Sequence, residues 1–118
     1  VLEGTGFALR DARSVLGDLA GGFEEYVFVG GGTRNATWLG IVADILGVDG
    51  QVAGTVDASV GAAMVAGVAA GAFAGVGDAV ERCSHYRGAV CHRRANRAAY
   101  DRLFERYLRI KQALDAAY

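Results

Sequence analysis

The chain has 118 residues and a formal net charge of −1, with 12 Lys plus Arg against 13 Asp plus Glu. This length supports one domain. A content of 53% apolar and 21% charged residues excludes a disordered chain, because enough surface can be buried to offset the ordering entropy. The near-neutral charge gives no electrostatic basis for wrapping nucleic acid. With 18 Gly and 0 Pro, turns must come from Gly, Asp and Asn.

Residues 1–19 have the spacing of an amphipathic helix. Apolar side chains fall on one side of it at helical intervals: Leu2, Leu9, Val15, Leu16 and Leu19. Gly21-Gly22 predicts the end of this helix. The sequence starts directly with the helical pattern, without an initiator Met or a signal-peptide pattern, so we expect a piece of a longer chain.

The next segment predicts a strand, a glycine-rich turn and a helix. Residues 25–29 form a short β-prone run bounded by Gly, typical of a buried strand, and three glycines follow at once. A helix is predicted over residues 36–46, with Asn35 as its N-cap and Gly47 as its C-terminal stop. Residues 51–56 favour a second strand, at a spacing that permits a parallel βαβ crossover.

Residues 58–77 carry no charge over 20 positions, a length that could cross a bilayer. The run is mostly Ala and Gly, which insert weakly, and no Lys or Arg flanks its N-terminal side. We therefore favour a buried soluble helix, capped by Asp57 or Ser59, over a membrane span. Residues 78–94 are polar without a clear period, apart from a short helical turn over 78–83, and residues 96–118 predict a strong amphipathic helix.

The sharpest candidate for chemistry is the turn that holds Gly30, Gly31, Gly32, Thr33 and Asn35. Glycines after a strand let backbone amides approach a ligand, and the positive end of the next helix points to the same place, so phosphate or ribose oxygens are the natural ligands. The dinucleotide fingerprint fails because its third Gly falls on Asn35, and no Gly-Lys-Ser/Thr follows as in a P-loop. The alternative interpretation, in which the turn only tightens the junction between strand and helix and binds no ligand, remains open.

Cys83, His85, Cys91 and His92 are all zinc-ligand types, but their spacing matches no common finger or ribbon. We favour two reduced thiols and two surface imidazoles, and leave metal binding open. Nine of the twelve cations lie between residues 82 and 111, which favours a solvated face over a polyanion site. No Ser-His-Asp or Cys-His catalytic arrangement is legible, so no catalytic residue is nominated, and Asp44 is interpreted as a structural residue within its helix.

Three stretches together resemble the C-terminal part of the FGGY-family carbohydrate kinases, which include xylulokinases, ribulokinases and glycerol kinases. They are VLEGTGFALRD (residues 1–11), GGGTRNATW with ADILG (residues 30–38 and 43–47) and DASVGAAM (residues 57–64). The closing helix over residues 100–114 also fits. The stretches keep the family's order and, together with the closing helix, are distributed over nearly the whole length of the chain. The sequence departs from the family in lacking the prolines usual after residue 47 and before the last helix.

The resemblance implies an α/β fold, part of an actin-like ATPase (ribonuclease H-like) domain with a short parallel sheet and packed helices, in which residues 1–118 are the C-terminal, ATP-binding portion. Gly31, Gly32 and Thr33 would lie against the ribose and α-phosphate, and Asn35 near the adenine. The parent enzyme would be cytoplasmic and use ATP and Mg²⁺ to phosphorylate a sugar or polyol. The family's catalytic aspartate lies upstream of Val1, so we expect no activity from this segment alone.

Two other functions stay open. One is a non-catalytic nucleotide-binding module of the same superfold, and the other a Rossmann-like oxidoreductase fragment, against which Asn35 argues. The sugar or polyol would bind through the missing N-terminal domain, with no nucleic-acid or membrane partner. Because a partial domain exposes apolar surface and an open sheet edge, we also expect a homo-oligomer.

Overall fold

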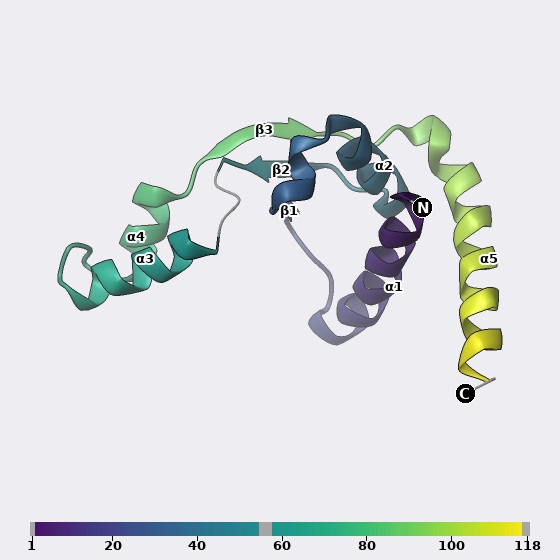
Figure 1. The fold of residues 1–118 in the computed structure, drawn as a ribbon, viewed down its shortest axis with the longest axis horizontal. Coiled ribbons are helices and arrows are strands. Elements are labelled where there is room, and N and C mark those ends of the chain that lie inside the picture. The colour runs from purple at the N-terminus through teal and green to yellow at the C-terminus, as the bar shows by residue number, and fades with distance from the viewer. Residues whose placement is uncertain (1, 55–57, 117–118) are drawn as a thin grey trace.

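The computed structural model describes residues 2–54 and 58–116, arranged as an arch (Figure 1). The elements in chain order are α1 (Leu2–Ala20), β1 (Val27–Phe28), the 3₁₀ turn η1 (Gly31–Arg34), α2 (Ala36–Leu46), β2 (Gly50–Ala53), α3 (Ser59–Ala69), α4 (Val76–Cys83), β3 (Tyr86–Val90), the 3₁₀ turn η2 (Arg94–Asn96) and α5 (Arg97–Asp115). The sheet lies at the top of the arch, α1 and α5 form one arm, and α3 and α4 form the other.

The sheet has the order β1-β2-β3. β1 and β2 are parallel, with Val27 opposite Gln51, which confirms the predicted crossover through α2. The prediction of a buried strand over residues 25–29 was wrong, because β1 holds two residues and Val27 is 44% exposed. β3 runs antiparallel to β2, with Val52 opposite Gly88. The sheet is therefore mixed, whereas the family resemblance implied a short parallel sheet. The interpretation of residues 78–94 as a largely irregular polar stretch was also wrong for residues 86–90. β3 is exposed along most of its length, so it lacks the alternation of apolar and polar residues that marks a half-buried strand.

The core is centred on α2, whose Val42, Ala43 and Ile45 are at most 1% exposed. α1 crosses α2 at Gly6, where an added Cβ would lie 2.6 Å from Cδ1 of Ile45, so a larger residue there would force the Ile45 side chain to shift. α5 contacts α1 through Phe7, whose ring lies 5.8–6.2 Å, between centroids, from those of Tyr100, Phe104 and Tyr107. The amphipathic pattern of the last helix is confirmed by these ring contacts.

The uncharged stretch over residues 58–77 is not the single buried helix that we predicted. α3 ends at Ala69, Gly71 adopts φ +75°, and α4 begins only at Val76. None of the residues of α3 is buried. The N-cap position of α3 is Ala58, which makes no side-chain capping bond, and Ser59 is already helical; Asp57 lies outside the described residues. No helix within residues 2–54 or 58–116 has the length and apolar character needed to span a membrane.

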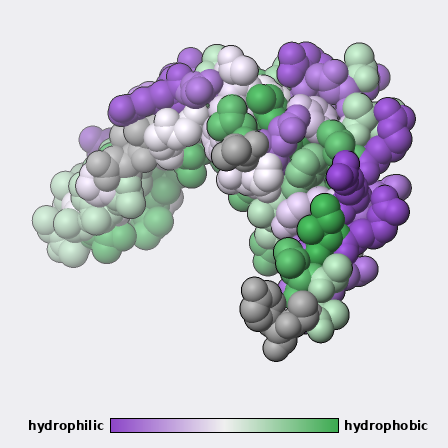
Figure 2. All heavy atoms as spheres, turned by 45° about the vertical axis from the view of Figure 1, so that its right-hand side comes forward, coloured by the Kyte–Doolittle hydropathy of each residue, from purple (hydrophilic) through white to green (hydrophobic). Residues whose placement is uncertain are grey.

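The arch leaves much apolar surface uncovered. Its radius of gyration is 17.5 Å, whereas a compact domain of this length has about 13.5 Å. Leu9, Leu16 and Leu19 of α1 remain 45–81% exposed, although they form the apolar side of an amphipathic helix. Figure 2 shows hydrophobic residues gathered over the arm of α3 and α4. An apolar surface of this extent on a small domain is typical of a face that packs against another body.

Candidate functional site

The five predicted site residues lie on one turn between β1 and α2. Gly30 adopts φ +93°, a conformation that side-chain-bearing residues rarely adopt, and this directs the chain from the strand into η1. Two backbone bonds close the turn, from Thr33 N to the Gly30 carbonyl (3.2 Å) and from Asn35 N to the Gly32 carbonyl (3.1 Å). The Thr33 hydroxyl also donates to the Gly30 carbonyl, at 2.8 Å.

The other two glycines of the turn differ in their surroundings. A Cβ added at Gly32 would lie 2.6 Å from Cζ3 of Trp38, so Gly32 is required by the packing of that ring. A Cβ added at Gly31 would meet nothing within 4 Å. The backbone at Gly31 is therefore open to an approaching ligand, whereas Gly32 also has a structural role.

Asn35 is the N-cap of α2, as the sequence predicts. It has extended backbone angles (φ −95°, ψ 100°), and its Oδ1 accepts a hydrogen bond from Trp38 N at 3.0 Å. Gly47 ends the same helix in the left-handed conformation, with φ +66°. Since capping uses Oδ1, only the side-chain NH₂ of Asn35 and the remaining lone pair of Oδ1 are left for a ligand.

Arg87 of β3 holds the turn from the side, and sequence reasoning missed it. Its Nη2 donates to the Thr33 carbonyl at 2.6 Å and to the Thr33 hydroxyl at 2.8 Å. Thr33 is 5% exposed, whereas Arg87 lies on the exposed strand β3, so these bonds are partly buried. In the sequence Arg87 is one cation among many, because β3 itself was not predicted and no pattern indicated that this strand crosses beside the turn.

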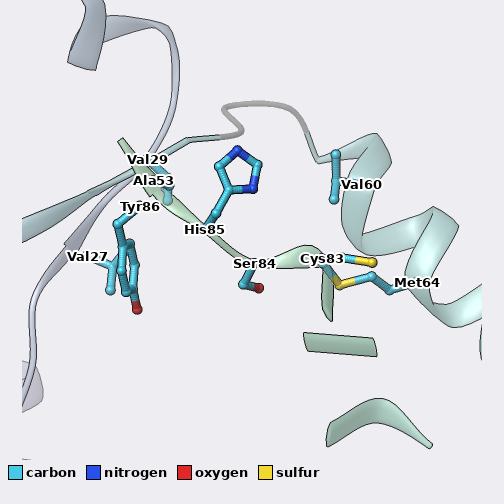
Figure 3. Close-up of a pocket in the computed structure, with 9 residues that line it drawn as sticks. All are labelled: Val27, Val29, Ala53, Val60, Met64, Cys83, Ser84, His85 and Tyr86. Carbon is cyan, nitrogen blue, oxygen red and sulfur yellow. The ribbon is translucent and has the colours of Figure 1, made fainter. Parts of the chain in front are cut away.

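Two apolar pockets flank the strands near the turn. One, of about 390 Å³, is lined by residues of α1, β1, η1, α2 and the segments on either side of β1, among them Leu9, Leu16, Phe23, Val29, Thr33 and Trp38. The other, of about 240 Å³, lies between the strands and the α3–α4 arm (Figure 3). Met64, Cys83 and His85 line it, and Cys83 is a free thiol.

The four potential metal ligands do not gather at one place. Cys83 and His85 lie before β3, whereas Cys91 and His92 follow it. His92 is bonded instead to Asp49, whose Oδ1 lies 2.7 Å from Nδ1 and 2.9 Å from the backbone amide of His92. Within the described part of the chain, no three His, Cys, Asp or Glu side chains are placed to hold a metal ion.

Asp44 is a structural carboxylate. It is 1% exposed and accepts hydrogen bonds from Arg93 N (2.6 Å), Arg93 Nε (2.9 Å) and Asn96 Nδ2 (2.6 Å). Burial by itself would raise the pKa of Asp44, but the bonds from Arg93 and Asn96 outweigh it and hold this pKa below 3.8. An ionised carboxylate with its oxygens engaged in this way joins α2 to η2 and is not available as a general base.

Comparisons with known proteins agree on one family. The family model for the C-terminal domain of the FGGY family of carbohydrate kinases matches residues 1–70. No curated protein matches the chain. The chain is similar to the crystal structure of a xylulose kinase from Rhodospirillum rubrum, with 29% identity and a TM-score of 0.79, over 98% of this chain and 24% of that one. A xylulose kinase from Brucella ovis gives 30% identity and a TM-score of 0.80, over 99% and 24%.

The chain thus spans about a quarter of the length of the kinases that it matches. Those neighbours are sugar kinases of the actin-like ATPase fold, and the α/β arrangement of strands and helices described above superposes on part of it. The family match covers more than half of the chain and includes the turn at residues 30–35. The chain therefore belongs to the FGGY family of carbohydrate kinases.

Proposed function

We propose that this chain forms the adenosine-binding part of a cytoplasmic kinase that transfers a phosphoryl group from ATP to a sugar or polyol. The observation that carries the proposal is the turn between β1 and α2. Its backbone is open at Gly31, and it precedes the N-terminus of an 11-residue helix, whose dipole favours an anion. Gly30, Gly31, Gly32 and Thr33 would face the ribose and α-phosphate, and the NH₂ group of Asn35 the adenine.

Mg²⁺ would accompany ATP, but the described residues offer no cage for it. They contain no cluster of three carboxylate, imidazole or thiol groups, and Mg²⁺ bound to a nucleotide is usually held by phosphates, water and one or two carboxylates. The metal would neutralise charge on the phosphates during transfer. The part of this chain would be to hold and orient the nucleoside end of ATP.

We also propose that the chain by itself does not phosphorylate a sugar. Phosphoryl transfer depends on a group that orients or deprotonates the attacking hydroxyl. Among the described residues, the buried carboxylate is Asp44, whose oxygens are occupied by Arg93 and Asn96. The base and the sugar site would be provided by the rest of a full-length kinase, consistent with the quarter of the matched kinases that this chain spans.

Binding of ATP to the 118-residue chain tests the proposal by calorimetry, with Gly31→Ala as the variant. The added methyl meets no protein atom within 4 Å, so the fold should tolerate it, but it would meet a ligand lying on the turn. Gly61→Ala, in α3, adds a methyl in similarly open space away from the turn and is the matched control.

We expect Gly31→Ala to weaken ATP binding about tenfold or more, a loss of about 1.4 kcal/mol, and Gly61→Ala to leave it unchanged. A wild-type chain that binds neither ATP nor adenosine would refute the assignment, and so would equal binding by the two variants. Turnover of a sugar by the isolated chain would refute its predicted inactivity. A full-length parent that binds ATP without phosphorylating any sugar or polyol would favour the non-catalytic module.

A further inference from the structure

The strand β3 reaches the candidate nucleotide site through one side chain. Arg87 lies 54 residues from Thr33 in the sequence, yet a single nitrogen, Nη2, donates to both oxygens of Thr33, at 2.6 and 2.8 Å. We propose that Arg87 is a positioning residue of the glycine turn, which fixes the direction of its backbone amides before a nucleotide binds. This inference rests on the proposed function.

The turn needs such an anchor because of its composition. Three consecutive glycines have more backbone freedom than any other tripeptide, and fixing them on binding would cost conformational entropy. Thr33 is the first residue after them with a side chain, and it is 5% exposed. An anchor at Thr33 therefore restricts the whole run, and a preorganised turn binds more tightly because less entropy is lost on binding.

The hydrogen bonds form a chain from Arg87 to the first glycine. The Thr33 hydroxyl accepts from Arg87 and donates its own proton to the Gly30 carbonyl at 2.8 Å. A hydroxyl has one donor and two acceptor positions, so one hydroxyl can make both bonds. Because Arg87 orients the Thr33 hydroxyl, it adds to the hold that the Thr33 amide already has on the Gly30 carbonyl.

Fixing these carbonyls fixes the amides. In a planar trans peptide, the N–H points opposite to the C=O of the same unit. The bond to the Gly30 carbonyl therefore directs the Gly31 N–H away from Thr33, and the bond to the Thr33 carbonyl directs the Arg34 N–H away from Arg87. Arg87, a residue outside the turn, thus helps to hold two peptide planes of the turn in one orientation.

The first test needs no ligand. Arg87→Met keeps the length and apolar stem of the side chain but removes the donors, and Arg102→Met, on the exposed face of α5, is the control. In a ¹⁵N-labelled chain, Arg87→Met should shift the Gly31 and Arg34 amide resonances and speed exchange of the Thr33 amide, which is bonded to the Gly30 carbonyl. Unchanged resonances and exchange at these three amides would overturn the proposal.

The second test measures binding of ADP and adenosine. We expect Arg87→Met to weaken both about tenfold, since a hydrogen bond from a charged donor contributes on that scale, and Arg87→Lys to restore binding in part. In a double-mutant cycle, the losses of binding free energy caused by Thr33→Val and Arg87→Met should be less than additive, because both substitutions remove one contact.

The outcomes separate the two proposals. Additive effects would show that Arg87 acts independently of Thr33, and a loss for ADP with none for adenosine would show that Arg87 does not order the part of the turn that faces the ribose. Either result would overturn the positioning role. Suppose that Arg87→Met changes the amide resonances and exchange of the ligand-free chain as expected, but the wild-type chain binds no nucleotide. The proposed function then fails, whereas the effect of Arg87 on the orientation of the turn is established.

Discussion

Asp44 of α2 accepts hydrogen bonds from both the backbone amide and the side-chain Nε of Arg93, at 2.6 and 2.9 Å. The two residues are 49 positions apart, and Arg93 immediately precedes η2, which leads into α5. The carboxylate is 1% exposed, whereas the Arg93 side chain is 64% exposed. The contact therefore fixes where the chain turns from the sheet into its last helix.

Asp44→Asn should destabilise the fold by about 2 kcal/mol, because the amide has one acceptor oxygen and its NH₂ would face the donors of Arg93 and Asn96. Urea unfolding followed by circular dichroism measures this. Asp49→Asn is the matched control, since its carboxylate is 61% exposed and Oδ1 alone makes its bonds to His92. Equal unfolding midpoints for the two variants would contradict a structural role for Asp44.

The stability of the chain should fall in acid. The pKa of Asp44 is lowered as described, and the bond from Arg10, with Arg97 nearby, lowers the pKa of Asp101. Both groups have an ordinary pKa of 3.8. A carboxylate whose folded-state pKa is depressed contributes stability that is fully present above its unfolded-state pKa and is lost as the pH falls through the folded-state pKa.

Unfolding in urea at a series of pH values from 7 to 3 checks this sign. We expect the free energy of unfolding to change little above about pH 5 and to fall progressively below it. Asp44→Asn should flatten that dependence, because one of the depressed carboxylates is gone. A wild-type chain that becomes more stable on acidification, or a variant with an unaltered pH slope, would count against the assignment.

The contribution of Asn35 to helix stability, as the N-cap of α2, should be separable from its proposed contribution to nucleotide binding. Asn35→Ala removes the acceptor for Trp38 N and should cost about 1 kcal/mol. Asn35→Asp keeps a side-chain oxygen and should retain most of that stability, but it lacks the NH₂ group proposed to face adenine. Thermal unfolding and ATP titration of both variants test the separation, and an Asn35→Ala chain as stable as wild type would disprove the cap.

Gly32→Ala should perturb the packing of Trp38, the single tryptophan of the chain. Its Cβ would lie 2.6 Å from the ring, so the ring or the turn must move, at a cost of about 1–3 kcal/mol. Tryptophan fluorescence and urea unfolding report the change directly. Gly31→Ala, with no neighbour within 4 Å, should leave both signals as in wild type. Identical emission spectra and midpoints for Gly32→Ala and wild type would contradict the close contact.

We propose that the isolated chain self-associates into a dimer or larger species through the apolar face of α1 and β1, which contains the exposed residues Leu9, Leu19 and Val27. Leu16 is 54% exposed and lines the 390 Å³ pocket beside that face. Leu16→Gln should shift sedimentation-velocity profiles toward monomer, because apolar area would no longer be buried between copies. Leu114→Gln, at 55% exposure on α5, is the matched control. A wild-type chain that sediments as a monodisperse monomer at all concentrations would refute the proposal.

Local signals determined most elements of this protein. Asn35 and Gly47 mark the two ends of α2. The side-chain cap of Asn35 and the left-handed backbone of Gly47 each depend on one or two residues, so a short stretch of sequence is enough to predict them. The apolar periodicity of α1 and α5 likewise predicted both helices. The family resemblance, carried by three stretches in order, agrees with the match over residues 1–70.

Non-local contacts decided the rest. β3 is a strand because Gly88 pairs with Val52, and its exposed side chains carry no period that would predict it. The break at Gly71 and the exposure of α3 depend on what packs against that arm, which its Ala- and Gly-rich composition does not specify. The bond from Arg87 to Thr33 joins residues 54 apart, so only the register of the sheet could bring that guanidinium to the glycine turn.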